Sequence, residues 1–249
     1  RLAQGHLAHA ADHRERGAQF MGCVGGEALE FAKGGLQPRQ QGVEGNGQTE
    51  LIEALTGLRK AESGSVLLGG KEISLLSIRE RIQNGMAHIP EDRQKRGLVL
   101  DYSIEENMIL ETHREKPFSS NGFLDAAAIR SHANKLIEAF DVRSGEGAIS
   151  KTRDMSGGNQ QKAIIAREFD LDPELLIAVQ PTRGLDVGSI EYIHKRLIEQ
   201  RDSGKAVLLV SLELDEILDL SDRIAVLNNG ELIGVVDAAT TNEKEVGLM

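Results

Sequence analysis

Two uninterrupted apolar runs limit what this chain can fold into more than any other feature of its sequence. They are residues 175–179 and 206–210, and an amphipathic segment that carries Ile190, Ile193 and Leu197 lies between them. Five apolar residues in a row, without alternation, are typical of a strand buried on both faces of a parallel sheet. Strands that alternate with helices place those helices on the faces of the sheet. The sequence therefore predicts an α/β fold with a mainly parallel sheet.

Shorter patterns predict the rest of this core and a helical insert. Residues 64–73 and 224–236 are expected to form hairpins, and residues 86–89 a short buried strand that ends before Pro90. The segment 91–153 is charged and mostly helical. Its best helix is expected over residues 125–140, with one apolar face made of Ile129, Ala133, Leu136, Ile137 and Phe140.

Composition excludes several classes of partner. The 249 residues are enough for one large α/β domain or for a core domain with a subdomain. A net charge of −10 argues against nucleic acid or anionic lipid as a direct surface partner. The single cysteine, Cys23, excludes an internal disulfide framework. The sequence contains no bilayer-length apolar run and no signal-peptide core, so work at a membrane is expected to require a partner.

A glycine-rich stretch precedes the helix expected over residues 50–55. Gly42, Gly47 and Thr49 have the spacing of a Walker A loop, whose backbone N–H groups bind phosphate and whose Thr hydroxyl binds Mg²⁺. The residue before Thr49 should be Lys, but it is Gln48, which donates a hydrogen bond without bringing a charge. The alternative is an ordinary glycine-rich turn. With the motif described next, we favour a degenerate nucleotide-binding loop that consists of Gly42, Gly45, Asn46, Gly47, Gln48, Thr49 and Glu50.

A second motif opens the helix that follows residue 156. Ser156 suits an N-cap, and Gly157 and Gly158 let another molecule approach the backbone closely. Free N–H groups and the positive end of the helix dipole then favour a phosphate. On these residues alone, a Ser-capped helix with a glycine-rich start is the simpler interpretation.

The longer string decides between these interpretations through a resemblance. Ser156-Gly157-Gly158-Asn159-Gln160-Gln161-Lys162, followed by Pro181-Thr182-Arg183-Gly184-Leu185-Asp186, resembles the signature helix and D-loop of ABC-type ATPases. More narrowly, and with Gly45-Asn46-Gly47-Gln48, it is similar to the second ATPase half of importers for simple sugars and nucleosides. The resemblance implies a P-loop (RecA-like) core with a helical subdomain. It also implies that Ser156, Gly157, Gly158, Asn159, Gln160 and Asp186 act in trans on ATP held by the opposite ATPase domain.

The same resemblance implies that this chain's own catalytic site is degenerate. The family's Asp-Glu pair falls on Val179 and Gln180, its histidine on Leu212, and its Q-loop glutamine on Glu91. With Gln48, these changes remove the groups that dominate phosphoryl transfer. We therefore expect static ATP binding, weakly held Mg²⁺ with Thr49 as its ligand, and little turnover. One hypothesis gives Glu91 part of the missing metal charge; the alternative is a solvated residue beside the permease contact.

The resemblance covers residues 42–249 and breaks upstream. Segment 1–41 contains His6, His9 and His13, whose spacing fits no metal site, and neither Phe20 nor Phe31 lies in a convincing strand. We interpret it as an atypical segment outside the native family sequence, which leaves the β subdomain incomplete. The expected parts are then the phosphate-loop core at 42–91, the helical subdomain at 92–154, the rest of the core at 155–237 and a tail at 238–249 without an element of its own.

The sequence thus favours the ATP-binding half of a sugar or nucleoside importer, peripheral at the cytoplasmic face of the cell membrane. Its expected partners are a competent ATPase half, permease subunits and an external solute-binding protein, and nucleic acid is not among them. The competing hypothesis is a non-catalytic nucleotide-binding module that regulates a soluble complex. An ABC-type ATPase of DNA repair or translation is disfavoured by the acidic charge. Co-purification with membrane proteins separates the first hypothesis from the others.

Overall fold

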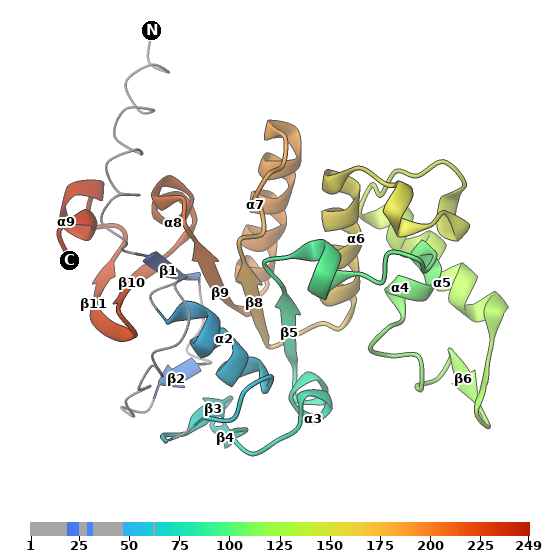
Figure 1. Ribbon diagram of the computed structural model, residues 1–249, viewed down its shortest axis with the longest axis horizontal. Helices are drawn as coiled ribbons and strands as arrows, with labels where there is room; N and C mark the ends of the chain where they lie inside the picture. Colours follow the sequence, from blue (N-terminus) through green and yellow to red (C-terminus); the bar gives the residue numbers. More distant parts are fainter. Residues whose placement is uncertain (1–18, 25–28, 32–46, 62) are drawn as a thin grey trace, which may run out of the picture. The chain divides into compact units, whose positions relative to one another are not determined.

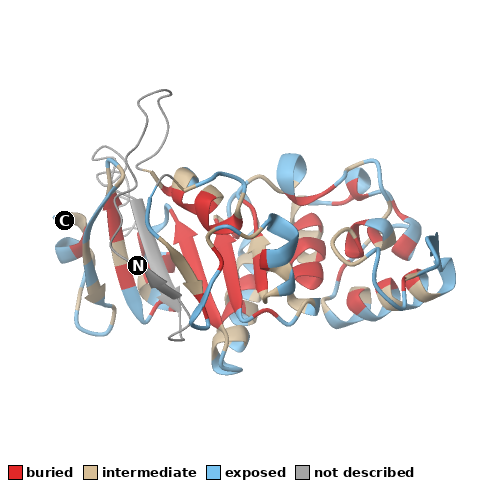
Figure 2. Ribbon diagram, turned by 90° about the horizontal axis from the view of Figure 1, so that it is seen from below, coloured by how far each residue is buried: buried red, intermediate tan, exposed pale blue. Residues whose placement is uncertain are grey.

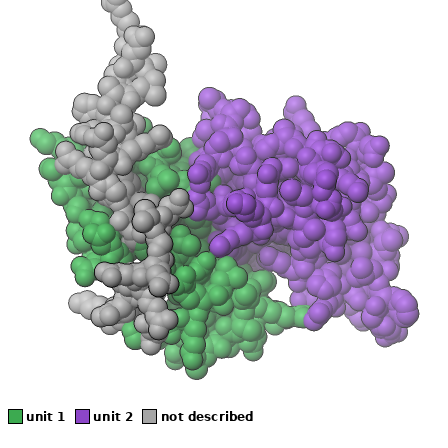
Figure 3. All heavy atoms as spheres, in the orientation of Figure 1, with its two compact units in different colours: residues 1–86, 174–180, 194–249 green, residues 87–173, 181–193 purple. Residues whose placement is uncertain are grey.

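The computed structural model describes residues 19–24, 29–31, 47–61 and 63–249. Within these residues the chain forms two compact units, which Figure 3 colours separately. Unit 1 takes residues up to 86 together with 174–180 and 194–249, and unit 2 takes 87–173 and 181–193. Each unit therefore collects segments that are far apart in the sequence.

The elements follow one another along the chain as labelled in Figure 1. Unit 1 contains β1 (Gln19–Val24), β2 (Leu29–Phe31), α2 (Gln48–Thr56), β3 (Val66–Leu68), β4 (Lys71–Glu72), α3 (Ile78–Gln83), β8 (Leu175–Val179), β9 (Ala206–Ser211), α8 (Leu214–Leu220), β10 (Arg223–Asn228), β11 (Glu231–Asp237) and α9 (Glu243–Gly247). Unit 2 contains η1 (Arg93–Gly97), α4 (Ile104–Met108), β6 (Ser119–Ser120), β7 (Phe123–Leu124), α5 (Ala126–Ala139), η2 (Gly147–Ile149), η3 (Thr152–Asp154) and α6 (Gly157–Asp170). Two elements contain a unit boundary: β5 (Met86–Ile89) and α7 (Val187–Asp202).

The main sheet has six strands in the order β11-β10-β1-β9-β8-β5. Strands β8 and β9 are parallel, whereas β1 is antiparallel to both β9 and β10. Strands β8, β9 and β10 therefore run in the same direction, and their carboxyl ends lie at one edge of the sheet. The predicted α/β class is confirmed, and the sheet is mixed because β1 and β11 run against their neighbours.

The core of unit 1 forms where the two apolar runs pack against α2. Every residue of β8 and β9 is buried, as the uninterrupted runs predict (Figure 2). Leu51, Ile52 and Leu55 form the buried face of α2 and belong to the same apolar cluster as alternate residues of both strands. This packing holds the amino end of α2, which follows the phosphate loop, over the sheet.

The N-terminal segment differs from the expectation. Phe20 lies in β1 and Phe31 in β2, so the prediction that neither occupies a strand is wrong. These strands form through backbone pairing with distant segments, because β1 bonds to β9 and β10 on its two sides and β2 bonds to β3. With β3 and β4, strand β2 makes a three-stranded antiparallel sheet. His6, His9, His13, Gly42, Gly45 and Asn46 lie outside the described residues.

Unit 2 is built around the predicted amphipathic helix. α5 begins after Asp125, whose carboxylate accepts hydrogen bonds from the N–H groups of Ala127 and Ala128. Its face of Ile129, Ala133 and Leu136 is buried, as predicted. The same apolar cluster includes residues of α4 and α6, so α4, α5 and α6 form one helical layer.

The C-terminal region confirms one expectation and corrects another. The hairpin predicted at residues 224–236 is β10 and β11, and Asn229 and Gly230 have the positive φ angles that its turn requires. The tail is not free of structure, because Asn242 caps α9 and Val246 is fully buried. Within the described residues, none of the helices combines the length and the apolar character that crossing a bilayer demands.

Candidate functional site

The phosphate-loop helix of unit 1 begins at the carboxyl edge of the parallel strands. Gly47 precedes α2 with a φ of 95°, and a Cβ at Gly47 would lie 2.7 Å from the Cα of Gly230. Gly230 belongs to the turn after β10, so the amino end of α2 lies at the edge where β8 and β9 also end. Any larger residue at position 47 would strain the backbone and displace this turn.

Gln48 is the first residue of α2, and its side chain points inward. It is 8% exposed, and its Nε2 has no hydrogen-bond partner among the described residues. Leaving a buried amide donor unpaired costs about 1–3 kcal/mol, so such a group favours an acceptor that arrives from outside. A phosphate oxygen fits this donor. The following residue, Thr49, is exposed, and Glu50 lies in the first turn of the helix.

The ends of β8 and β9 carry the two other predicted positions. Gln180 has a φ of 50°, in the left-handed region, and its N–H donates to the carbonyl of Val210 at 2.7 Å. Left-handed glutamine is uncommon and costs of the order of 1 kcal/mol, and no pattern in the sequence indicated it. Leu212 follows β9 with 47% of its surface exposed. Neither side chain brings a charge to this edge.

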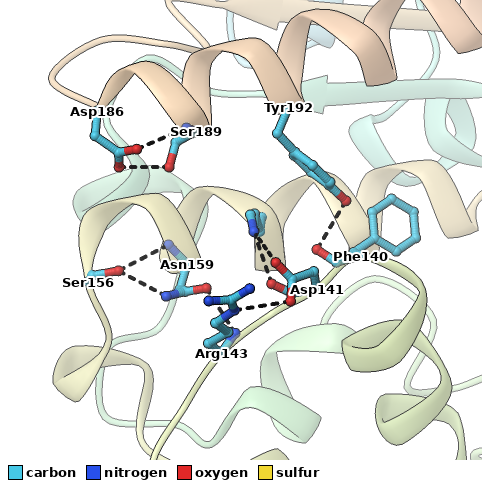
Figure 4. A network of polar contacts seen from close by, with 9 residues as sticks. Phe140, Asp141, Arg143, Ser156, Asn159, Asp186, Ser189 and Tyr192 are labelled. Atoms are coloured by element: carbon cyan, nitrogen blue, oxygen red, sulfur yellow. Dashed lines mark hydrogen bonds and ion pairs between the residues drawn. The ribbon is translucent and has the colours of Figure 1, made fainter.

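The signature helix of unit 2 begins as expected. Ser156 is exposed and caps α6, where its hydroxyl oxygen accepts from the N–H of Asn159 at 3.4 Å (Figure 4). The side-chain amide of Asn159 donates to the same oxygen at 3.0 Å. α6 is 14 residues long, so its amino end carries the positive end of a helix dipole.

Asn159 and Gln160 face their own unit rather than solvent. The Asn159 Oδ1 accepts from the N–H of Arg143 at 2.8 Å. Gln160 is 1% exposed, and its amide donates to the carbonyl of Thr152 at 2.9 Å. Their side-chain polar groups thus bond inside unit 2, and the role in trans that the sequence gives both residues stays a prediction.

The two glycines of the motif are half-buried, and each lies against a side chain of unit 2. A Cβ on Gly157 would lie 2.9 Å from the Nη2 of Arg93, and a Cβ on Gly158 would lie 2.5 Å from the Oγ of Ser189. Asp186 holds that serine, because its carboxylate accepts from the Ser189 N–H at 3.0 Å and from its hydroxyl at 2.8 Å (Figure 4). These bonds lower the pKa of Asp186.

Lys162 fixes the middle of the signature helix. Its Nζ donates to the Asp141 carboxylate at 2.8 Å and lies 4.7 Å from the centre of the Tyr192 ring. The Tyr192 hydroxyl in turn donates to the carbonyl of Phe140 at 3.0 Å (Figure 4). α6 is therefore held between the end of α5 and the first half of α7.

Glu91, the predicted Q-loop position, is paired with a neighbouring side chain, and its role toward Mg²⁺ stays a prediction. It is exposed, and its carboxylate forms an ion pair with the guanidinium of Arg183. Arg93, two residues on, donates from Nη1 to the Arg183 carbonyl at 3.0 Å. The segment after β5 is thus tied to the turn that leads to Asp186.

A buried charge pair in α6 was not anticipated from the sequence. Arg167 donates from Nε and Nη2 to the Oε1 of Glu168 at 2.9 and 2.7 Å, and from Nη1 to the carbonyl of Gly97 at 2.9 Å. The other oxygen of Glu168 accepts from the N–H of His88 at 3.2 Å. Adjacent Arg and Glu in a helix normally face different directions, so only the tertiary packing reveals this pair.

Two titratable groups in unit 2 respond to burial and to this pair. Burial raises the pKa of Glu111 to about 7, and the negative charge of Glu168 adds to the rise. Burial lowers the pKa of His88 to about 4, with the positive charges of Arg96 and Arg167 acting in the same direction.

Comparison with known proteins identifies the family. The family model described as ABC transporter matches residues 41–183, which is more than half of the chain. The chain belongs to the ABC transporter family. Among curated relatives, the nucleoside import ATP-binding protein NupA of Lactococcus lactis is 55% identical over 208 residues, covering 84% of this chain and 41% of the relative. The guanosine import ATP-binding protein NupO of Bacillus subtilis matches with the same identity and coverage.

More distant ABC transporter relatives and solved structures agree with this assignment. The ribose import ATP-binding protein RbsA of Bacillus licheniformis is 37% identical over 205 residues, covering 82% of this chain and 41% of the relative. The chain thus spans about 40% of the length of these relatives. A nucleotide-free ATP-binding cassette from an ABC transporter has a TM-score of 0.67 at 19% identity, covering 92% of this chain and 93% of that one. At this identity the likeness shows the ABC cassette fold.

Domains of the ABC transporter family bind ATP with Mg²⁺. The unpaired, buried amide of Gln48 at the amino end of α2 fits a phosphate group. At the strand ends, Gln180 and Leu212 supply no carboxylate for Mg²⁺, and the exposed Thr49 is the hydroxyl at the helix end. The part of the chain that the structure describes also contains no cluster of three His, Cys, Asp or Glu residues suited to a metal ion.

Proposed function

We propose that this chain is the ATP-binding part of an importer for nucleosides or simple sugars. The support comes from relatives named as nucleoside, guanosine and ribose import ATP-binding proteins, to which 82–84% of the chain aligns. In this proposal the chain lies at the cytoplasmic face of the cell membrane. It is bound to permease subunits and a competent ATPase half, and an external solute-binding protein delivers the solute.

The chain's own phosphate loop is proposed to hold nucleotide with little turnover. Gln48 donates to a phosphate oxygen from a buried position, and Thr49 at the same helix end is the available oxygen ligand for Mg²⁺. Bound Mg²⁺ would neutralise phosphate charge. Gln180 and Leu212 lack the base and the imidazole that would activate water. The site therefore retains binding and loses the large electrostatic contributions to catalysis.

The signature of unit 2 is proposed to act on the γ-phosphate of ATP held by the partner ATPase half. The observation that carries this proposal is the exposed Ser156 at the positive end of α6. Its hydroxyl and the N–H groups of Gly157 and Gly158 offer donors to an anion at that surface. Asn159 and Gln160 support the loop from inside unit 2 instead of contacting the phosphate.

The experiment compares ATP turnover by the chain alone and by the chain mixed with the competent half. The chain alone should turn over ATP near background, and it should stimulate its partner. Ser156→Ala should lower that stimulation on the order of a hundredfold to a thousandfold, as loss of a transition-state donor does. Ser103→Ala is the matched control, because Ser103 caps α4 of the same unit and its loss should leave stimulation unchanged.

Two further results bear on the degenerate site. Gln48→Lys should tighten binding of ATP by the chain, because it restores a cation beside the phosphates. A robust turnover by the chain alone that disappears in Gln180→Ala would refute the degenerate assignment. Isolation of the chain in a soluble complex, without membrane proteins, would favour a regulatory nucleotide-binding module instead of an importer.

A further inference from the structure

Segment 91–94 of unit 2 reaches both parts of the surface that carries the signature. The Glu91 carboxylate pairs with Arg183 in the turn before Asp186. The Gln94 side-chain amide donates from Nε2 to the Oε1 of Gln160 in α6 at 3.1 Å. Residues that follow one another in sequence thus bind the signature helix and the D-loop turn at once.

Arg93 is the central member of this segment. Its Nη1 donates to the backbone carbonyl of Arg183 at 3.0 Å, and its Nη2 occupies the space beside Gly157 where a Cβ would be 2.9 Å away. The Nε of Arg93 is buried and has no hydrogen-bond partner within the described residues. The planar guanidinium therefore fills the gap between the first signature glycine and the D-loop turn, which the point charge of lysine does not do.

The opposite side of the motif is closed by a second contact. The Ser189 hydroxyl lies against Gly158 and is bonded to the Asp186 carboxylate at 2.8 Å. Gly157 lies against Arg93 and Gly158 against Ser189, and the lack of both Cβ atoms permits this close packing. The two contacts join the start of α6 to Arg93 and to the segment that contains Asp186.

We propose that segment 91–94 is a clamp that positions the signature and the D-loop turn, with Arg93 as its main positioning residue. This inference rests on the proposed function, because it concerns the surface that acts in trans. Glu91 then serves as a latch on Arg183 and not as a substitute ligand for Mg²⁺. Any displacement of segment 91–94 moves the surface that acts on the partner's ATP.

Hydrogen exchange of the full chain tests the clamp directly. Arg93→Gln should speed exchange of the backbone amides at residues 156–162 and 183–189 about tenfold, because a charged donor to a carbonyl is lost. Glu91→Gln should have a smaller effect, about twofold to fivefold, since the ion pair is exposed. Glu105→Gln is the matched control, because it breaks the exposed pair with Arg130 in the same unit without touching the signature.

Rescue separates a specific clamp from general loss of stability. Glu91→Arg should speed exchange at residues 183–189, and the double variant Glu91→Arg/Arg183→Glu should restore it by reversing the pair. Arg93→Lys should not restore the exchange rate seen with Arg93. Exchange at residues 156–162 that matches the Glu105→Gln control in every variant, or an increase spread evenly over unit 2, would overturn the clamp.

A functional measurement on the same variants keeps the two proposals apart. With the partner half, Arg93→Gln should raise the chain concentration needed for half-maximal stimulation more than it lowers the maximal rate. If the unaltered chain fails to stimulate any partner, the proposed function is refuted, while the exchange data alone still decide whether segment 91–94 is a clamp.

Discussion

Gly158→Ala perturbs the surface of the signature at its tightest point. The new Cβ would lie 2.5 Å from the Oγ of Ser189, closer than real Cβ contacts, so the hydroxyl would have to move by roughly 0.5–1 Å. Ser189 cannot move freely, because its N–H and its hydroxyl are both bonded to Asp186. The strain therefore falls on the capping bonds at the start of α7.

The size of the effect follows from three contributions. Overpacking costs about 1–3 kcal/mol, and a weakened hydrogen bond to a carboxylate costs about 1.5 kcal/mol more. Alanine has a higher helix propensity than glycine, which raises the free energy of unfolding by up to about 1 kcal/mol. Gly158→Ala should therefore lower the free energy of unfolding by about 1.5–4.5 kcal/mol.

Urea denaturation followed by circular dichroism measures this loss. Gly157→Ala is the comparison variant, because its Cβ would lie 2.9 Å from the Nη2 of Arg93, a smaller overlap than the 2.5 Å at Ser189, and it should cost less than Gly158→Ala. Replacing Ser189 by Gly should cost less in the Gly158→Ala background than in the original chain. Equal stability of the two alanine variants, or strict additivity with Ser189→Gly, would refute the packing argument.

Two further predictions concern the buried charges of unit 2. Arg167→Met leaves Glu168 buried and without its ion-pair partner, so it should lower the free energy of unfolding by about 3–5 kcal/mol in urea denaturation. The double variant Arg167→Met/Glu168→Gln should recover part of this loss. A loss below about 1 kcal/mol for Arg167→Met would contradict the pairing. The pKa of Glu111 is raised to about 7, so its contribution to the free energy of unfolding is present below pH 4.5 and is lost as the pH rises to 7. The pKa of His88 is lowered to about 4, so its contribution to the free energy of unfolding is present above pH 6.5 and is lost as the pH drops to about 4. Glu111→Gln should therefore gain stability relative to the unaltered chain between pH 4.5 and 7.5, by on the order of 3 kcal/mol, and an unchanged difference across that range would show that Glu111 is not buried as described.

The elements that could be predicted are those determined by residues close together in the sequence. Strands β8 and β9 were recognisable because burial on both faces requires an unbroken apolar run. α5 was recognisable from its apolar face and from Asp125 at its start. The cap at Ser156 was predictable for the same reason, since a serine before a helix bonds within three residues.

The parts that could not be predicted depend on contacts between distant segments. Strand β1 has no alternating pattern and forms because β9 and β10 offer bonding partners. The resemblance gave Gln160 a role in trans, and no local pattern indicated that its amide bonds to Thr152 and Gln94 inside the unit. The resemblance placed Glu91 at the Q-loop, but no local pattern indicated that Arg183, ninety-two positions along the chain, pairs with its carboxylate.

The place of β1 in the sheet has a consequence for handling the protein. β9 is buried at every position and apolar from residue 206 to 210, and the backbones of β9 and β10 both bond to β1. A truncation that starts after residue 24 would leave two unpaired strand edges on either side of a gap, one of them mostly hydrophobic. Edges of that kind recruit strands from other molecules, so shortened versions of this chain should collect in inclusion bodies.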